Sequence, residues 1–390
     1  MARIVFAGYA VRYPLGGYLW QTVHYLAGLR ALGHDAIFYE DSGLPNWELE
    51  AAYNPLTNEL SPAYDHGVAA VGAFLDRLGF GDRWVFVDLA RKREHGPWAG
   101  RAAELIDGAD LLISLGAVNG LPLEGWNGRP AIFIDSDPVY TQILVENGDA
   151  GVRTVLEAHT HLFTLGENIG TSRSTAPTAG LTWYPTRPPV ALDLWPRRAT
   201  AGPAYTTVGG WNAQGRDLSY RGQRLGWTKR TQWLRFLDVP ARTGAAFELA
   251  TNVDEVAGDR ELLTSHGWHF ADPRAVSTDP WRYRDYLSTS RGEFTVAKEM
   301  NVRLRSGWFS DRAVCYLAAG RPVVEQDTAF GDVLPCGPGL HAFDTPQQAA
   351  AAIRAIEADY EQASTHATHV AREYFAADRV IGSMLTRIGL

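Results

Sequence analysis

Three tight turns rich in glycine are the first features of this chain that could bind a ligand. They contain Gly16-Gly17, Gly209-Gly210 and the run from Ser306 to Asp311, and the first and third stand directly before segments with helical spacing. A helix start presents unpaired N–H groups at the positive end of its dipole, where phosphate binds readily. One such turn is equally well explained without a ligand, but three in one chain favour an anion site that includes Gly16, Gly17 and Gly210.

The third turn is predicted to cradle a diphosphate. Glycine allows close approach of backbone amides, two serine hydroxyls donate, and the arginine that follows supplies a positive charge. The two aromatic side chains would form the pocket wall. The alternative is an ordinary capped helix start with buried aromatics. The predicted cradle consists of Ser306, Gly307, Trp308, Phe309, Ser310, Asp311 and Arg312.

Two lysines extend this basic region. Lys229 stands near a predicted helix start, where a cation opposes the helix dipole and a bound diphosphate would compensate for it. Lys298 lies shortly before the cradle, with Glu293 in the same segment. The alternatives are a solvated lysine at 229 and an exposed ion pair between 293 and 298, which would stabilise the fold little.

Polar residues at predicted strand ends are candidates for the remaining roles, because ligands of open α/β sheets bind outside the carboxyl ends of strands. In the first half, Asp137 is the predicted general base for an acceptor hydroxyl, with Asp135 and His24 next in line. A turn that uses Asp before Pro138 explains the aspartates equally well. The candidates for ribose or donor-sugar contacts are Glu293, Lys298, Glu325, Gln326, Asp327 and Thr328.

Several common chemistries lack their motifs. The chain has no G-x-G-x-x-G after its first strand, no P-loop and no G-x-S-x-G elbow, which argues against dinucleotide oxidoreductases, P-loop NTPases and serine hydrolases. Its short histidine pairs lack zinc spacing, so no metal site is expected.

Composition sets the remaining bounds. The 390 residues carry a formal net charge of −8, which argues against a general nucleic-acid binder but not against a local pocket for one anionic ligand. We therefore expect small-molecule partners and no nucleic-acid partner. The two cysteines, the absence of a signal-like start and the absence of a long apolar run predict a cytoplasmic protein without a membrane span. Oligomeric state stays open.

The alternation of short β-branched runs with helical segments predicts an α/β fold of two Rossmann-like domains with parallel sheets that face each other across a cleft. A proline-dense stretch from Thr182 to Ala204 marks the boundary. The predicted units are an acceptor-side domain at 1–195, a donor-binding domain at 196–365 and a C-terminal helix at 366–390 that packs back on the first domain.

Two stretches carry a resemblance to a known family. The sequence "PLGGYLWQTVHYLAGLRALGH" resembles the opening of the large retaining (group 1) GT-B glycosyltransferases, and "YLAAGRPVV" resembles their A-x-G-x-P-V-V segment. That group has two glutamates eight positions apart before this segment. Here those positions hold Gly307 and Cys315, so the chain looks closer to divergent, CgeB-like relatives.

The resemblance implies a GT-B glycosyltransferase that moves a sugar from a nucleotide-diphospho-sugar, UDP- or GDP-linked, to a hydroxyl or amine. It implies a metal-independent hexosyltransferase whose co-substrate takes the place of a bound cofactor. Two alternatives stay open, a GT-B-shaped nucleotide-sugar 2-epimerase and a non-catalytic nucleotide-sugar-binding protein.

Overall fold

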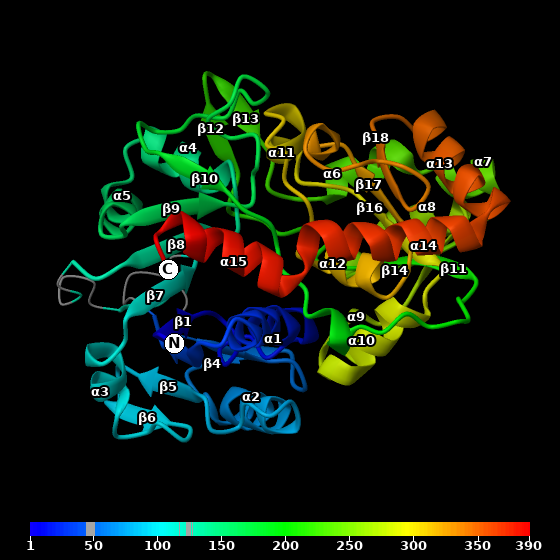
Figure 1. Cartoon of the computed structure of the whole chain (residues 1–390). Coiled ribbons are helices and arrows are strands. Elements are labelled where there is room, and N and C mark those ends of the chain that lie inside the picture. Colours follow the sequence, from blue (N-terminus) through cyan, green and yellow to red (C-terminus); the bar gives the residue numbers. More distant parts are fainter. Residues whose placement is uncertain (44–50, 117, 122–125, 127) are drawn as a thin grey trace.

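Two parallel β-sheets form the frame of the molecule (Figure 1). The computed structural model describes residues 1–43, 51–116, 118–121, 126 and 128–390. The first sheet has the order β10-β9-β8-β7-β1-β2-β5-β6, and only β6 runs antiparallel to its neighbour. Its strands are β1 (Arg3–Ala7), β2 (Asp35–Asp41), β5 (Trp84–Asp88), β6 (Arg93–His95), β7 (Leu111–Leu115), β8 (Ala131–Asp135), β9 (His161–Thr164) and β10 (Trp183–Pro185).

The second sheet has the order β15-β14-β11-β16-β17-β18 and is parallel throughout. Both sheets are buried on their two faces, which explains why their strands read as continuous apolar runs rather than as alternating ones. The strands of the second sheet are β11 (Ala204–Val208), β14 (Ala246–Ala250), β15 (Trp268–Phe270), β16 (Gly292–Thr295), β17 (Val323–Gln326) and β18 (Leu340–Phe343).

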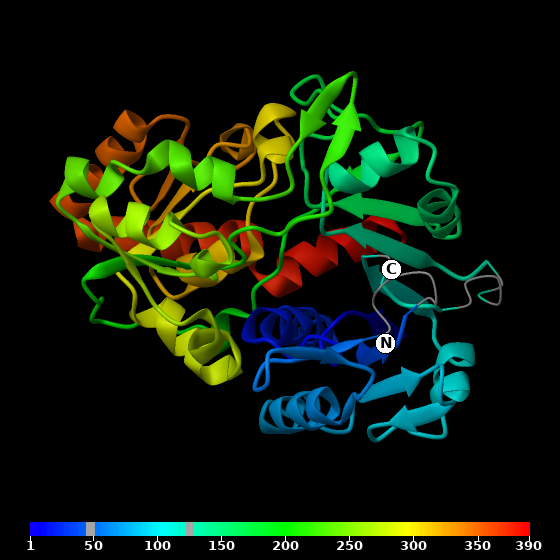
Figure 2. The ribbon, with the colours of Figure 1, turned by 180° about the vertical axis from the view of Figure 1, so that it is seen from behind.

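Helices cover both sheets, as Figures 1 and 2 show from opposite sides. Those before the linker are α1 (Gly16–Ala31), α2 (Asp65–Arg77), α3 (Ala102–Asp107), α4 (Tyr140–Glu146) and α5 (Ala150–Glu157). Those after it are α6 (Arg230–Trp233), α7 (Val239–Thr243), α8 (Asp259–Ser265), α9 (Pro273–Ser277), α10 (Pro280–Thr289), α11 (Glu299–Arg303), α12 (Asp311–Ala318), α13 (Pro346–Ala358), α14 (Tyr360–Val370) and α15 (Ala377–Arg387).

Two β-hairpins stand outside the main sheets: β3 (Ala52–Asn54) with β4 (Glu59–Ser61), and β12 (Leu218–Tyr220) with β13 (Gln223–Leu225). The second hairpin belongs to the later half of the chain but packs on the first sheet's helices. Tyr220 and Leu225 share a buried cluster with Ile143 of α4, and the Asn147 side-chain amide donates to the Ser219 carbonyl. The hairpin therefore spans the junction between the two halves.

The structure corrects three of the expected elements. The segment "GEFT", expected in a loop, is β16, a central strand of the second sheet, and its local signal is weak because it has only four residues, one of them a glycine. Pro240, expected to end a helix, instead stands in the first turn of α7. The long helical tail is not continuous, because the helical path breaks at Asp359 and again at Ala376.

The chain crosses between the halves twice. The linker after β10 contains Val190, whose amide donates to the Phe375 carbonyl and whose carbonyl accepts from Ala377. The return crossing occurs at this same point, so the C-terminal crossing begins at Ala376 rather than at residue 366. Helix α14 still packs against α12, whereas α15 (red in Figure 1) lies against α1.

Close packing of α1 on α15 depends on Gly28. A Cβ built there would lie 2.5 Å from Ile381 Cδ1 and 2.9 Å from both Cβ and the carbonyl oxygen of Ala377. Gly28→Ala should therefore force the helices apart and lower the free energy of unfolding by about 1–3 kcal/mol in chemical denaturation.

Gly382 on α15 provides the matched control for this experiment. A Cβ there would meet only Leu32 carbon atoms at 3.7 and 3.9 Å. Because alanine favours helix over glycine, Gly382→Ala should be neutral or stabilising by about 0.5–1 kcal/mol. Equal stability of the two variants would contradict the α1–α15 packing.

Candidate active site

The carboxyl ends of the two sheets face each other across the junction. In the second sheet β11 lies between β14 and β16, so the strand order reverses there, and such a switch point is where an open α/β sheet forms its ligand crevice. Strand β11 runs into Gly209-Gly210 and β16 runs towards Lys298. From the first sheet, β8 ends just before Asp137. These segments define the candidate active site.

The Gly209-Gly210 turn forms an open floor at the end of β11. Both glycines are exposed, and a Cβ built at Gly210 would meet no atom within 4 Å. At Gly209 the nearest atom would be Arg312 Nη1 at 3.7 Å. The bare backbone leaves space for a ligand directly above a guanidinium group.

Arg312 binds three groups of the second sheet. Its Nε donates to Glu293 Oε1 at 2.5 Å, Nη1 to the Val208 carbonyl at 2.7 Å and Nη2 to Thr295 Oγ1 at 3.0 Å. Its side chain is only 12% exposed and that of Glu293 is fully buried. The ion pair raises the pKa of Arg312, so the group stays charged. Arg312 thus fixes the ends of β11 and β16.

Lys229 lies against this charged layer. Its Nζ is 5.5 Å from the centre of the Trp308 ring. Burial, with Arg312 second, lowers the pKa of Lys229 to about 7, while Glu325 and Glu293 act in the opposite direction. Burial and Glu293 raise the pKa of Glu325 to about 8, and both Glu325 oxygens are buried without a hydrogen-bond partner among the described residues. An anionic ligand would favour protonated Lys229.

Lys298 reaches across the junction. Its Nζ donates to Asp137 Oδ1 at 2.7 Å and lies 3.1 Å from the centre of the Trp227 ring. Burial is the main cause that lowers the pKa of Lys298, and Asp137 opposes it. Of the three lysines in the chain, two, Lys229 and Lys298, therefore converge on this site.

The predicted cradle has a different structure. The amide of Gly307 donates to the Thr328 carbonyl, that of Trp308 to Ser306 Oγ, and that of Ser306 to the Asn301 carbonyl. These three amides are therefore not available to a ligand, so the part of the predicted cradle from Ser306 to Trp308 does not fit the structure, while the part from Phe309 to Arg312 stays a prediction. The part from Ser306 to Trp308 is instead a contact between the two halves.

That contact joins the cradle segment to the turn after β9. Trp308 forms an antiparallel bridge with Gly166, and the Asn168 amide donates to the Ser306 carbonyl at 2.9 Å. Gly307 has φ 75°, and a Cβ there would lie 2.9 Å from the Asn168 side chain. Phe309 is buried against Phe330 and Phe375. The glycine and the two aromatics before α12 thus serve close packing between the halves.

The remaining cradle residues form the N-terminal end of α12, at the junction between the two halves. Ser310 is the N-cap residue, but its side chain makes no capping hydrogen bond. Asp311 is half-buried and accepts from the Gln21 side chain at 3.3 Å. Of the predicted diphosphate set, the structure brings Gly210, Lys229, Trp308 and Arg312 together.

Most of the predicted ribose and sugar contacts are buried. Glu293, Glu325, Gln326 and Thr328 are each 0% exposed. Gln326 bonds to the Ala297 amide and to Gln232, Thr328 donates to the Trp308 carbonyl, and Asp327 caps a turn at Ala329. Lys298 and Asp327 alone in this set keep partial exposure. The buried carboxylates act on the electrostatics of the site from below.

His24 is not placed for proton transfer in the cleft. Its side chain is buried, Nδ1 accepts from the Ala191 amide at 3.1 Å, and Nε2 lies 3.6 Å from Cys315 Sγ. Burial lowers the pKa of His24 to about 3, so the ring is neutral. It connects α1, the linker and α12. His24 is therefore a packing residue, and its predicted role as a catalytic residue does not fit this position.

Two further predictions concern the first half. Gly16 is buried against Tyr283 of α10, and a Cβ added at Gly16 would lie 2.5 Å from the Tyr283 Cβ. Gly17 lies beside the same tyrosine, so this turn packs on α10.

Asp135 is buried and accepts from Thr141, Gln142 and Thr164. Burial raises its pKa to about 6. Of the two aspartates, only Asp137, with a 42% exposed side chain, faces the site.

Sequence reasoning missed two aromatic contributions. Trp227, two residues before Lys229, lies under Lys298, and Tyr18 stands on the first turn of α1, where the charge of Asp137 acts on it. The signal was present in both stretches, because "GWTK" and "YAVRYPLGGY" place aromatics next to the turns already singled out.

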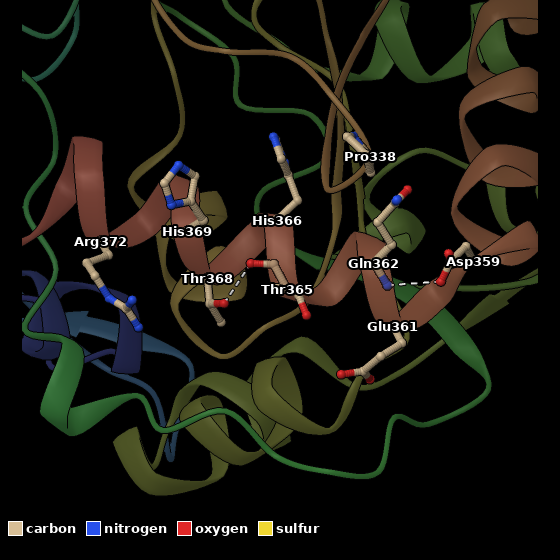
Figure 3. Close-up of a pocket in the computed structure, with 9 residues that line it drawn as sticks. All are labelled: Pro338, Asp359, Glu361, Gln362, Thr365, His366, Thr368, His369 and Arg372. Carbon is tan, nitrogen blue, oxygen red and sulfur yellow. Dashed lines mark hydrogen bonds between the residues drawn. The ribbon is translucent and has the colours of Figure 1, made fainter.

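A separate groove runs along α14 (Figure 3) and includes His366, His369 and Pro338. The Gly339 amide donates to His366 Nδ1, which places the groove at the amino end of β18. Ligands of parallel sheets bind at the opposite, carboxyl end. We therefore place the active site at the junction.

Within the described ranges, no group of three metal-ligating side chains occurs. Over the same residues, no helix is both long and apolar enough to cross a bilayer.

No protein-family model and no curated sequence matches the chain, but solved structures match its shape. An alpha-glucosyltransferase in complex with UDP superposes with a TM-score of 0.60 at 10% identity over 100% of both chains. AviGT4, a glycosyltransferase of avilamycin A biosynthesis, gives 0.53 at 13% identity over 99% of this chain and 97% of its own. Anabaena HepE with UDP gives 0.51 at 12% identity over 99% and 100%. This chain has the GT-B fold.

One prediction about partners was wrong. An alpha-glucosyltransferase that matches this chain over its full length with a TM-score of 0.60 is in complex with a 13-mer DNA. Net charge was therefore too weak a basis for excluding a nucleic-acid partner, because binding depends on the local field of one face rather than on the sum over the molecule.

The pairing of Arg312 with Glu293 makes a stability prediction. Arg312→Met leaves a fully buried carboxylate without its cation, and we expect a loss of about 3–5 kcal/mol in the free energy of unfolding at pH 8.

The exposed pair Arg260–Asp254 is the matched control, with side chains 40% and 68% exposed. Arg260→Met should cost less than about 1 kcal/mol. A similarly small loss for Arg312→Met would show that the Glu293 site is not the buried charge layer described above.

Proposed function

We propose that this protein is a glycosyltransferase that moves a hexosyl group from a UDP-linked donor to a hydroxyl or amine acceptor. The observation that carries the proposal is the convergence of Lys229 and Lys298 at the switch point of the second sheet, beside an open glycine floor. The GT-B fold supports it, since several solved structures of this fold hold UDP.

The donor diphosphate is proposed to lie over Gly209-Gly210, between the two lysines. Departure of the sugar leaves negative charge on the diphosphate, and cations fixed in a partly buried site stabilise that charge. Arg312 contributes from below through its field and through the positions of β11 and β16. Neutralisation of the leaving group by lysine and arginine makes a bound metal and a separate cofactor unnecessary, so both are proposed to be absent from the reaction.

Asp137 is proposed to handle the acceptor proton. It projects from the first half, it is partly exposed, and its contact with Lys298 places it directly beside the proposed leaving-group site. A carboxylate there can accept the proton of an attacking hydroxyl. Breaking the Lys298–Asp137 pair would free the lysine for phosphate and the carboxylate for the acceptor in one step.

UDP binding should weaken as pH rises from 7 to 9. Lys229 has a pKa of about 7 and Glu325 of about 8, and loss of a proton from either group makes the site more negative. The direction therefore does not depend on which group titrates first. Calorimetry of the wild-type protein should show Kd rising by about tenfold or more over this range.

Lys229→Met should bind UDP at least about tenfold more weakly at pH 7 and lose the part of this pH dependence that Lys229 causes, while the part from Glu325 remains. Lys92 is exposed in the first half and offers the matched control, so Lys92→Met should leave both affinity and pH profile unchanged. Wild-type protein that fails to bind UDP at pH 7 would contradict the proposed donor.

Asp137→Asn should reduce turnover of UDP-glucose by about a hundredfold, because the aspartate acts on the acceptor, while UDP should bind at least as tightly as to the wild type, because Lys298 loses its competing carboxylate. The ion pair is partly buried, with Lys298 21% and Asp137 42% exposed, so the stability change should be about 1–2 kcal/mol. Turnover is measured as UDP release with and without acceptor, and the product's anomeric configuration is recorded.

Asp107→Asn, at an exposed position of α3, is the control and should leave turnover unchanged. Full activity of Asp137→Asn with an inverted product would exclude Asp137 as the base. Formation of a free 2-epimer in place of a transferred sugar would instead identify an epimerase.

A further inference from the structure

Four tyrosines form one cluster at the carboxyl edge of the first sheet. The rings of Tyr9 and Tyr13 stack with centroids 5.1 Å apart, and Tyr13 stacks on Tyr53 at 5.7 Å. Tyr18 meets Tyr9 edge-on at 5.4 Å and Tyr13 at 6.5 Å. The proposed transfer chemistry uses none of these rings.

A buried charged pair holds this cluster in place. Glu40 at the end of β2 is fully buried, and it accepts the amides of Ala10 and Val11 at 2.6 Å and that of Arg12 at 3.0 Å. Arg12, also fully buried, pairs with Glu40 at 3.1 Å, and its guanidinium lies 4.7 Å from the centre of the Tyr9 ring. Such a pair is costly to bury. Here it fixes the loop that carries Tyr9 and Tyr13.

Tyr18 is the member of the cluster on the side of the active site, because Gln21, one turn further along α1, donates to Asp311 at the start of α12. It is 39% exposed, whereas the other three are half-buried. Partial burial among the neighbouring rings raises the pKa of Tyr18, with further contributions from Asp137 and Asp311, while Arg216 lowers it. Its hydroxyl therefore lies within electrostatic range of Asp137 in the first half and of two groups in the second.

We propose that Tyr18, supported by Tyr9, Tyr13 and Tyr53, is the acceptor subsite and binds a neutral saccharide ring. An aromatic face packs against the apolar C–H face of a sugar, and the carboxylates of Asp137 and Asp311 are acceptors for its hydroxyls. These carboxylates repel phosphate, so a neutral sugar fits this position better than a nucleotide. The subsite extends the proposed glycosyl transfer, because it names the class of acceptor, and it rests on that function.

The test is saturation-transfer NMR on the full-length protein with UDP present. The probes are methyl glucoside, methyl galactoside, methyl mannoside, maltose, cellobiose and lactose, with thymidine as a nucleoside comparison. We expect at least one saccharide to receive saturation, strongest at the protons of one ring face. Tyr18→Ala should weaken its affinity by about three- to tenfold, and Tyr18→Phe, which keeps the ring, should retain most of it.

Tyr184→Ala provides a control tyrosine in β10, outside the cluster, and should leave saccharide binding unchanged. Saturation of no saccharide, saturation of thymidine alone, or equal binding by wild type and Tyr18→Ala would each overturn the subsite. Calorimetry with UDP on the same variants separates the two proposals, because Tyr18→Ala should keep wild-type UDP affinity. Failure of UDP to bind would contradict the donor site, whereas loss of saccharide binding on Tyr18→Ala would still support the subsite.

Discussion

The packing of α1 against the second half of the chain is the constraint on which the rest of this structure depends. Gly16 contacts Tyr283 of α10, and Trp20 donates its indole N–H to the Pro280 carbonyl at 2.7 Å. The main hydrophobic cluster runs without interruption through α1, α10, α12 and α15. The two sheets therefore share one core, and the distance between their carboxyl ends is set by side-chain packing rather than by the linker.

That fixed distance determines which charged side chains of the two sheets meet. Lys298 and Asp137 come from different sheets, and they meet only because the halves are held together. Beneath them, Arg312 and Glu293 form a buried ion pair. Lys229 lies next to this layer, and its low pKa follows from burial and the neighbouring cation. The site gathers three cations, each set against a carboxylate, and an anionic ligand would compete with those carboxylates for the cations.

The same junction explains several residues that resembled a ligand site. Gly307 and Gly16 are glycines because another backbone or ring approaches closely, and His24 is a neutral hydrogen-bonding group between three segments. Close approach of a ligand and close approach of a neighbouring domain demand the same residue types. A pattern of aromatic, glycine and serine residues before a helix therefore predicts a close contact. It does not distinguish a bound ligand from a neighbouring domain.

The sequence by itself determined the α/β class, the two-sheet organisation and most strands, because apolar runs, turn residues and the proline-dense linker are local signals. It also singled out Gly210, Lys229, Lys298 and Asp137, whose positions after predicted strands follow from chain order alone. Only the tertiary structure decided which of these meet, that β16 is a central strand, and that Ser306–Trp308 pairs with Gly166–Asn168. The physical reason is that burial and pairing between segments more than a hundred residues apart leave no periodic trace in either segment.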